Sequence, residues 1–184
     1  MRKNNINMLE GPLSKNILLY ALPVVLSGAL QLVYNAADMI VVARWAGGTA
    51  LAAVGSNTAL INLIINFFIG LSVGANIIVG RCYGAKDKTT LQNVVHTAMA
   101  TSVICGLVAM LVGLFVARRA LILMSAPKEV LDLATLYLRI YFLGMPATTI
   151  YNFGAAILRA VGDSKRPLYI LAVSGIINIV LNII

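Results

Sequence analysis

The chain has 184 residues, of which 60% are hydrophobic and only 11% are charged. Soluble domains usually carry about 25% charged residues, so this composition excludes a soluble domain and predicts an all-α, polytopic membrane protein with helical spans. The net charge of +8 does not indicate nucleic-acid binding, because the basic residues lie in short loops between apolar segments.

Five apolar segments along the chain are predicted to cross the membrane. They are residues 17–42, 51–80, 94–117, 140–161 and 168–184, the last of which the chain leaves incomplete. Gly47 and Gly48 predict a short turn between the first two segments. The second segment would form a helix of roughly 45 Å, which is longer than the hydrocarbon core of about 30 Å, so we expect it to tilt or protrude.

The third and fourth segments contain irregular features. Gly106 and Gly113 lie seven residues apart on one face of the third and predict close packing against another helix. Gly144 and Pro146 interrupt the fourth. Residues 128–139, just before it, read as an amphipathic lead-in at the membrane interface.

Asp38 is the only charged residue between residues 16 and 43. A carboxylate near the centre of a membrane helix costs about 2.5–3.5 kcal/mol to insert, and such groups usually mark an ion or substrate path. Gln31, Tyr34 and Asn35 fall on the same helical stripe as Asp38. The alternative is a structural aspartate that bonds to another helix or reaches interfacial water near a helix end.

Polar side chains also follow one face of the second segment and of the fifth. Asn62, Asn66 and Asn76 share one face of the second, and Asn178 and Asn182 lie one turn apart in the fifth. Asparagines in membrane helices commonly act as hydrogen-bonded contacts between helices, and that reading stays open for each asparagine of the second segment.

Metal and disulfide chemistry are not predicted. Cys82 and Cys105 form no CxxC pair, and a lone histidine such as His96 near the start of a span is more often a solvated or capping group than a proton carrier. We expect no metal site, no catalytic constellation and no enzymatic activity.

The basic residues predict the orientation in the membrane. Nine lie on one side (Arg2, Lys3, Lys15, Arg81, Lys86, Lys88, Arg159, Lys165 and Arg166) and five on the other (Arg44, Arg118, Arg119, Lys128 and Arg139). The richer side is expected to be cytoplasmic, which puts the N-terminus inside a multi-pass protein of the inner cell membrane.

Several ordered stretches resemble the multidrug and toxic compound extrusion (MATE) transporters, most closely prokaryotic members of the DinF-like type. They are EGPLSKNILLYALPVVLSGALQLVYNAADMIVV, GGTALAAVGSN, GLSVGANIIVGRCYGAKD, YLRIYFLGMPA and ILRAVGDSKRPLYI ahead of GIINIVLN. The resemblance covers nearly the whole chain. It implies that residues 1–184 are part of an N-terminal lobe, with about five of its six helices, and that the sixth helix and the C-terminal lobe are missing.

The resemblance also implies a function. MATE proteins export drugs and other organic, often cationic, compounds in exchange for protons or sodium ions, so the expected partners are small organic substrates, membrane lipid and the missing lobe, with no cofactor beyond the coupling ion. Asp38 matches the coupling aspartate of the first helix, and Asn178 matches a fifth-helix asparagine of the coupling network. Gln31, Tyr34, Asn35, Asn62 and Asn66 are expected to line the cavity or its network.

Two departures from the family pattern affect this reading. Many members carry a second aspartate where this chain has Asn182, so Asp38 would be the only intramembrane carboxylate of the lobe. The chain also lacks the second lobe that alternating access requires, and residues 1–184 alone are not expected to transport.

Other functions remain as alternatives. A flippase for lipid-linked oligosaccharides of the same superfamily would be expected to place basic residues in its cavity, and the predicted spans carry none away from their ends. A membrane channel or a small assembly subunit is the remaining possibility.

Overall fold

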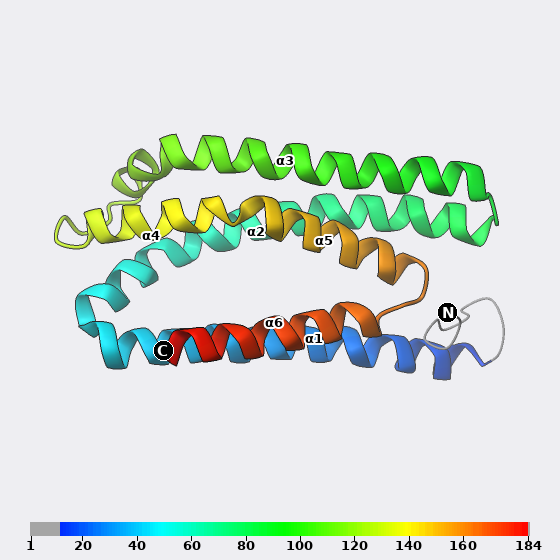
Figure 1. Cartoon of the computed structure of the whole chain (residues 1–184), viewed down its shortest axis with the longest axis horizontal. Helices are drawn as coiled ribbons and strands as arrows, with labels where there is room; N and C mark the ends of the chain where they lie inside the picture. The colour runs from blue at the N-terminus through cyan, green and yellow to red at the C-terminus, as the bar shows by residue number, and fades with distance from the viewer. Residues whose placement is uncertain (1–11, 184) are drawn as a thin grey trace. The chain divides into compact units, whose positions relative to one another are not determined.

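The computed structural model describes residues 12–183 and consists of helices joined by short turns (Figure 1). The helices are α1 (Leu13–Val41), a π-helix (Val42–Ala46), α2 (Gly47–Gly84), α3 (Lys88–Leu123), α4 (Leu131–Leu143), α5 (Met145–Ala160) and α6 (Lys165–Ile183). No strand occurs among the described residues. The expected all-α fold is therefore confirmed.

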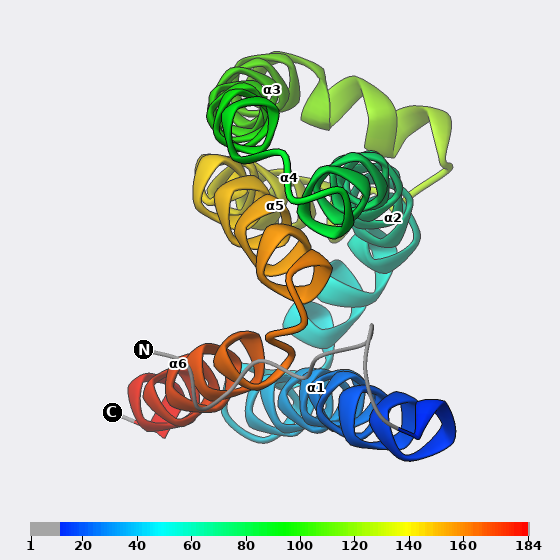
Figure 2. The same cartoon turned by 90° about the vertical axis from the view of Figure 1, so that its right-hand side faces the viewer.

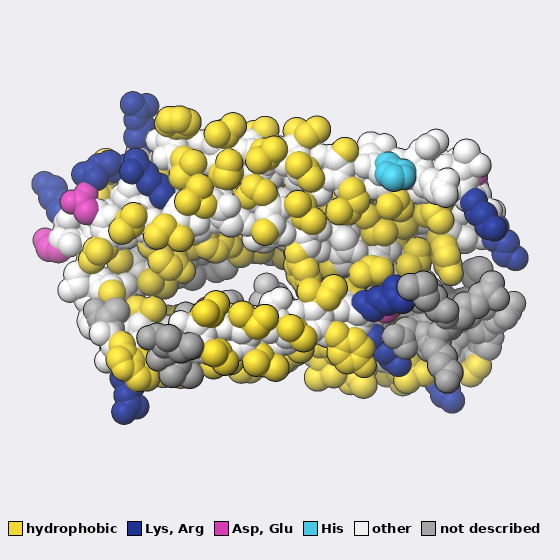
Figure 3. All heavy atoms as spheres, viewed as in Figure 1, with side chains coloured by type: hydrophobic (Ala, Val, Ile, Leu, Met, Phe, Trp, Pro, Cys, Tyr) yellow, Lys and Arg dark blue, Asp and Glu magenta, His cyan; other side chains and the backbone are white. Residues whose placement is uncertain are grey.

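Within residues 12–183, three helical stretches are long and apolar enough to cross a membrane: Ser14–Trp45, Gly47–Gly84 and Lys88–Leu123. They contain the first three predicted segments. Their large apolar side chains point largely outward, as expected where lipid rather than water surrounds the protein. Along α3, hydrophobic side chains gather over its left and middle parts, other side chains predominate on the right, and basic side chains lie near the ends (Figure 3).

The turn between α1 and α2 has a local backbone cause. Gly47 has φ +81°, a conformation that side-chain-bearing residues rarely adopt, and it begins α2 directly after the π-helix. The helix direction therefore changes at the glycine pair that the sequence indicates.

The described chain forms two compact units, and α1, α2, α3 and α5 each contribute to both. The first unit contains residues up to 39, 73–96 and from 154 onward, and the second contains residues 40–72 and 97–153.

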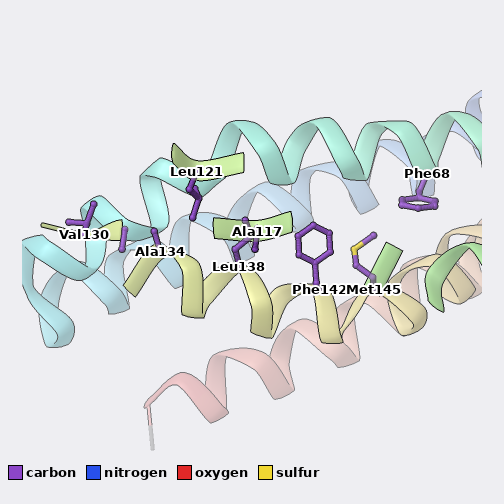
Figure 4. Packing of buried hydrophobic residues seen from close by; sticks show 9 residues of the cluster. Phe68, Ala117, Leu121, Val130, Ala134, Leu138, Phe142 and Met145 are labelled. Atoms are coloured by element: carbon purple, nitrogen blue, oxygen red, sulfur yellow. The ribbon is translucent and has the colours of Figure 1, made fainter. Parts of the chain in front are cut away.

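The core of the second unit lies where α2, α3 and α4 meet. Leu121, Leu138 and Met145 are fully buried there, and Leu138 and Phe142 project from α4 into the space between the helices (Figure 4). Phe142 packs directly on Gly113 of α3. A side chain at that position would collide with the ring, so the glycine sets how closely α3 and α4 approach.

Gly106, two turns before Gly113 in α3, has the same role toward α5. A β-carbon there would meet the Thr149 hydroxyl and the backbone of Pro146 in α5. The prediction that Gly106 and Gly113 allow close helix packing is confirmed.

The segment 128–139, expected as an amphipathic lead-in, lies mostly in α4, in which Ala134 and Leu138 have no exposed surface. Their spacing of four residues, continued by Phe142, makes one apolar face that packs on α2 and α3. The helix then ends at Gly144, so the predicted segment 140–161 is divided between α4 and α5.

The first unit is built on the parallel pair α1 and α6, which lie side by side (Figures 1 and 2). The Tyr34 hydroxyl donates a hydrogen bond to the Ala172 carbonyl at 3.3 Å. Near the start of the pair, the Tyr20 hydroxyl donates to the Arg159 carbonyl at 3.2 Å. Arg159 belongs to the last turn of α5, so this second bond ties α1 to the segment just before α6. The helices α1 and α6 run in the same direction (Figures 1 and 2).

Candidate functional site

The candidate residues of α1 lie on its second half. Tyr34 and Asp38 are half-buried, and Gln31 and Asn35 are exposed. Tyr34 contacts α6 through its hydroxyl and also through its ring, which lies against Gly175. The polar stripe predicted from the sequence is therefore partly covered by α6.

The register of α1 and α6 relates Asp38 to Asn178. Asp38 comes one turn after Tyr34, and Asn178 comes about one turn after Gly175, the residue that Tyr34 touches. In parallel helices with equal rise per residue, these two side chains lie at the same level. The structure thus brings the two predicted coupling residues onto neighbouring helices of one unit.

The remaining candidates are distributed differently. Asn182 lies in the last turn of α6, and its side chain is outside the described part of the chain. Asn62 and Asn66 are exposed on α2 in the second unit. The Asn66 amide donates to the Asn62 carbonyl at 2.7 Å, a bond within one helix turn.

Comparison with known proteins decides the family. The sequence matches the MatE family over residues 23–184. The chain belongs to the MATE family.

Named relatives and solved structures of this family cover nearly all of the chain. It is 38% identical over 167 residues to the probable multidrug resistance protein YoeA and 29% identical over 174 residues to the probable multidrug resistance protein YpnP, both of Bacillus subtilis. A crystal structure of MATE in complex with MaD3S matches 99% of the chain with a TM-score of 0.89 and 30% identity.

The MATE chain described here spans only part of the length of these proteins. It covers 36% of YoeA, 39% of YpnP and 41% of the MATE chain in the crystal structure, while 91%, 94% and 99% of its own residues are matched.

Sequence reasoning missed one polar contact inside this MATE chain. Asn57 has no exposed surface, and its amide donates to the Ala53 carbonyl at 2.9 Å and to the Ala134 carbonyl at 3.0 Å. The second bond ties α2 to α4. A usable signal was present, because Asn57 shares a helical face with Ala53 and Ile61, which pack in the core.

Asn76 is a second asparagine that joins helices. Its amide donates to the Ala156 carbonyl of α5 at 2.6 Å in the first unit. For Asn76, the reading as a hydrogen-bonded contact between helices is confirmed.

The turn between α5 and α6 contains a buried carboxylate that the sequence did not indicate as buried. Asp163 has 1% of its surface exposed, accepts a hydrogen bond from the Arg166 backbone at 3.1 Å, and pairs with the Arg166 guanidinium at 3.0 Å. It caps the N-terminus of α6, and Gly162 at φ +85° lets the chain turn just before it.

The described residues contain no cluster of three metal-ligating side chains, and Cys82 and Cys105 are free thiols. The candidate site described in this chain is the polar pair on α1 and α6.

Proposed function

We propose that the protein containing this chain is a secondary active antiporter that exports organic, often cationic, compounds in exchange for protons or sodium ions. Membership of the MATE family and two relatives named as probable multidrug resistance proteins support export. Because the chain spans well under half of those relatives, transport is assigned to the whole protein, with a further lobe completing the cavity.

The observation that carries the coupling proposal is the position of Asp38. It is the one charged residue between residues 16 and 43, half-buried, and level with Asn178 on the adjacent parallel helix. A carboxylate held there carries a large cost when charged and little cost when a proton or sodium ion neutralises it.

This difference supplies a means of coupling. Neutralised Asp38 favours closer packing of its surroundings, while the charged form favours a wetter state that holds a cationic substrate. A ligand shifts a conformational equilibrium only through such a differential interaction with the two states. Ion binding from outside and ion release to the cytoplasm would then drive export.

The test uses the full-length protein in proteoliposomes loaded with ethidium, a fluorescent organic cation, under an imposed proton or sodium gradient. We expect Asp38→Asn to insert and fold but to lose gradient-driven efflux, and Asp38→Glu to retain part of it. Asp132→Asn is the matched control, because Asp132 is an exposed carboxylate in a surface ion pair with Arg118. Wild-type efflux by Asp38→Asn would leave Asp38 as a structural residue.

We also propose that the protein lies in the inner cell membrane with its N-terminus in the cytoplasm. The support is the distribution of the 14 basic residues, nine on the N-terminal side and five on the other. The α2–α3 and α5–α6 turns would then face the cytoplasm, and the α3–α4 connection would face outward.

A further inference from the structure

A cavity of about 450 Å³ lies in the second unit between α2 and α3, a size within the range of about 300–1,000 Å³ that is typical of ligand pockets. One wall is formed by Leu63 and Phe67 of α2, and the other by Val112 and Val116 of α3. We call this cavity the α2–α3 groove. Phe142 of α4, which packs on Gly113, contributes to its lining.

The groove is apolar throughout and accessible from outside. No lining residue carries a polar or charged side chain. Leu63 and Phe67 are 68% and 66% exposed, and Val112 and Val116 are 54% and 46% exposed. Ordered water needs two or more polar partners, so water is a poor occupant of such a space.

The surroundings of the groove point to a lipid. Its walls belong to two of the helices that are apolar enough to cross a membrane, so hydrocarbon is the medium next to it. A helix with its side chains is about 10–12 Å wide, which is broad for a groove between two neighbouring helices. An acyl chain is narrower and needs only apolar contact.

A basic side chain marks one end of the groove. Val112, Val116 and Arg119 follow at spacings of four and three residues, so they form one ridge of α3. Ala120, next to Arg119, still lines the cavity. Arg119 is exposed at the end of the predicted third span, where a long basic side chain reaches the headgroup region.

We propose that the α2–α3 groove binds one acyl chain of an anionic phospholipid, with the lipid phosphate held by Arg119. The apolar walls provide contact area for the chain, and the guanidinium provides charge complementarity and donors in a geometry that suits phosphate oxygens. This site belongs to the second unit and shares no residue with the polar pair on α1 and α6, and it does not depend on which compound is exported or which ion is coupled.

The test is fluorescence quenching by brominated lipid in the full-length protein, with every native tryptophan, including Trp45, replaced by phenylalanine. One reporter is Phe67→Trp in the groove. The matched control is Phe115→Trp, which is also on a membrane-spanning helix and 80% exposed but does not line the groove. Dibrominated phosphatidylglycerol is titrated into phosphatidylcholine vesicles that contain either reporter.

We expect quenching at residue 67 to saturate at a low fraction of phosphatidylglycerol and to prefer it about fivefold over brominated phosphatidylcholine. Quenching at residue 115 should rise in proportion to the brominated fraction. Adding Arg119→Gln should remove the preference at residue 67 and leave residue 115 unchanged. Leu63→Trp replaces the first reporter if Phe67→Trp does not fold.

Three outcomes would overturn the proposal. Equal, proportional quenching at both positions would make the groove ordinary lipid-facing surface. No quenching at residue 67 would mean that another part of the protein covers the groove. Saturable quenching with an unchanged preference in Arg119→Gln would remove the assigned role of the arginine.

Discussion

The ring of Tyr34 in α1 lies against Gly175 in α6 so closely that a β-carbon on the glycine would overlap it. The Tyr34 hydroxyl donates to the Ala172 carbonyl one turn earlier in α6. One tyrosine therefore fixes both the distance and the register of the two helices that carry Asp38 and Asn178.

We predict that Gly175→Ala destabilises the full-length protein by about 1–3 kcal/mol, because the added methyl group must displace an aromatic ring. The measurement is thermal or denaturant unfolding of the purified protein in detergent. Gly28→Ala in α1 is the control, since its β-carbon would meet no atom within 4 Å and alanine is the better helix former. Equal stability of Gly175→Ala and wild type would show that the ring moves away at little cost.

A second prediction concerns the bond between α2 and α4. Asn57→Ala should cost about 1–3 kcal/mol, because it removes a buried hydrogen bond between α2 and α4 together with a fully buried side chain. Asn66→Ala should change stability by less than about 0.5 kcal/mol, since Asn66 is exposed and bonds only within its own helix. Unfolding of the two variants side by side tests this, and similar losses for both would contradict it.

The contrast between these asparagines shows where sequence reasoning succeeds. The first three membrane helices were predictable because length and apolar composition are local properties. The close packing at Gly106 and Gly113 was predictable because two glycines on one face of an apolar helix let another helix approach its backbone closely.

The parts that sequence reasoning did not find depend on tertiary neighbours. In the sequence, Leu138 lies on the apolar side of an amphipathic segment. Only the structure shows that this side is buried against α2 and α3. Asn57 and Asn66 look alike in the sequence, but only Asn57 faces a carbonyl of another helix. For the candidate site, the solitary charge identified Asp38, whereas the contacts of Tyr34 with α6, which place Asp38 level with Asn178, required the structure.

A third prediction concerns acid sensitivity at the α2–α3 turn. Asp87 caps α3 by accepting a hydrogen bond from the Thr90 backbone at 3.0 Å. Hydrogen bonds from the Thr90 side chain, then from the Thr90 and Thr89 backbone, hold the pKa of the Asp87 carboxyl below its ordinary value of 3.8. A lowered folded pKa means that the cap contributes fully above 3.8 and loses its contribution as the pH falls through the folded value.

Hydrogen exchange at the Thr90 amide measures this directly. After correction for intrinsic exchange rates, protection should hold near neutral pH and decline in the acid range below the ordinary pKa. Asp87→Asn should retain a cap whose protection does not titrate there, because an amide oxygen accepts the same bond without ionising. A parallel decline in both proteins would assign the acid sensitivity to another group.

The last prediction concerns orientation. With Cys82 and Cys105 replaced by serine, we expect Lys88→Cys at the α2–α3 turn to resist a membrane-impermeant maleimide in intact cells and to react after the cells are opened. Lys128→Cys in the α3–α4 connection should react in both cases. The reason is that nine of the 14 basic residues lie on the side of the α2–α3 turn, and the side richer in basic residues stays in the cytoplasm. Both positions are exposed, so a difference in labelling reports sidedness rather than burial. Labelling of Lys88→Cys but not Lys128→Cys in intact cells would reverse the orientation, and Arg119 with its lipid phosphate would then belong to the cytoplasmic leaflet.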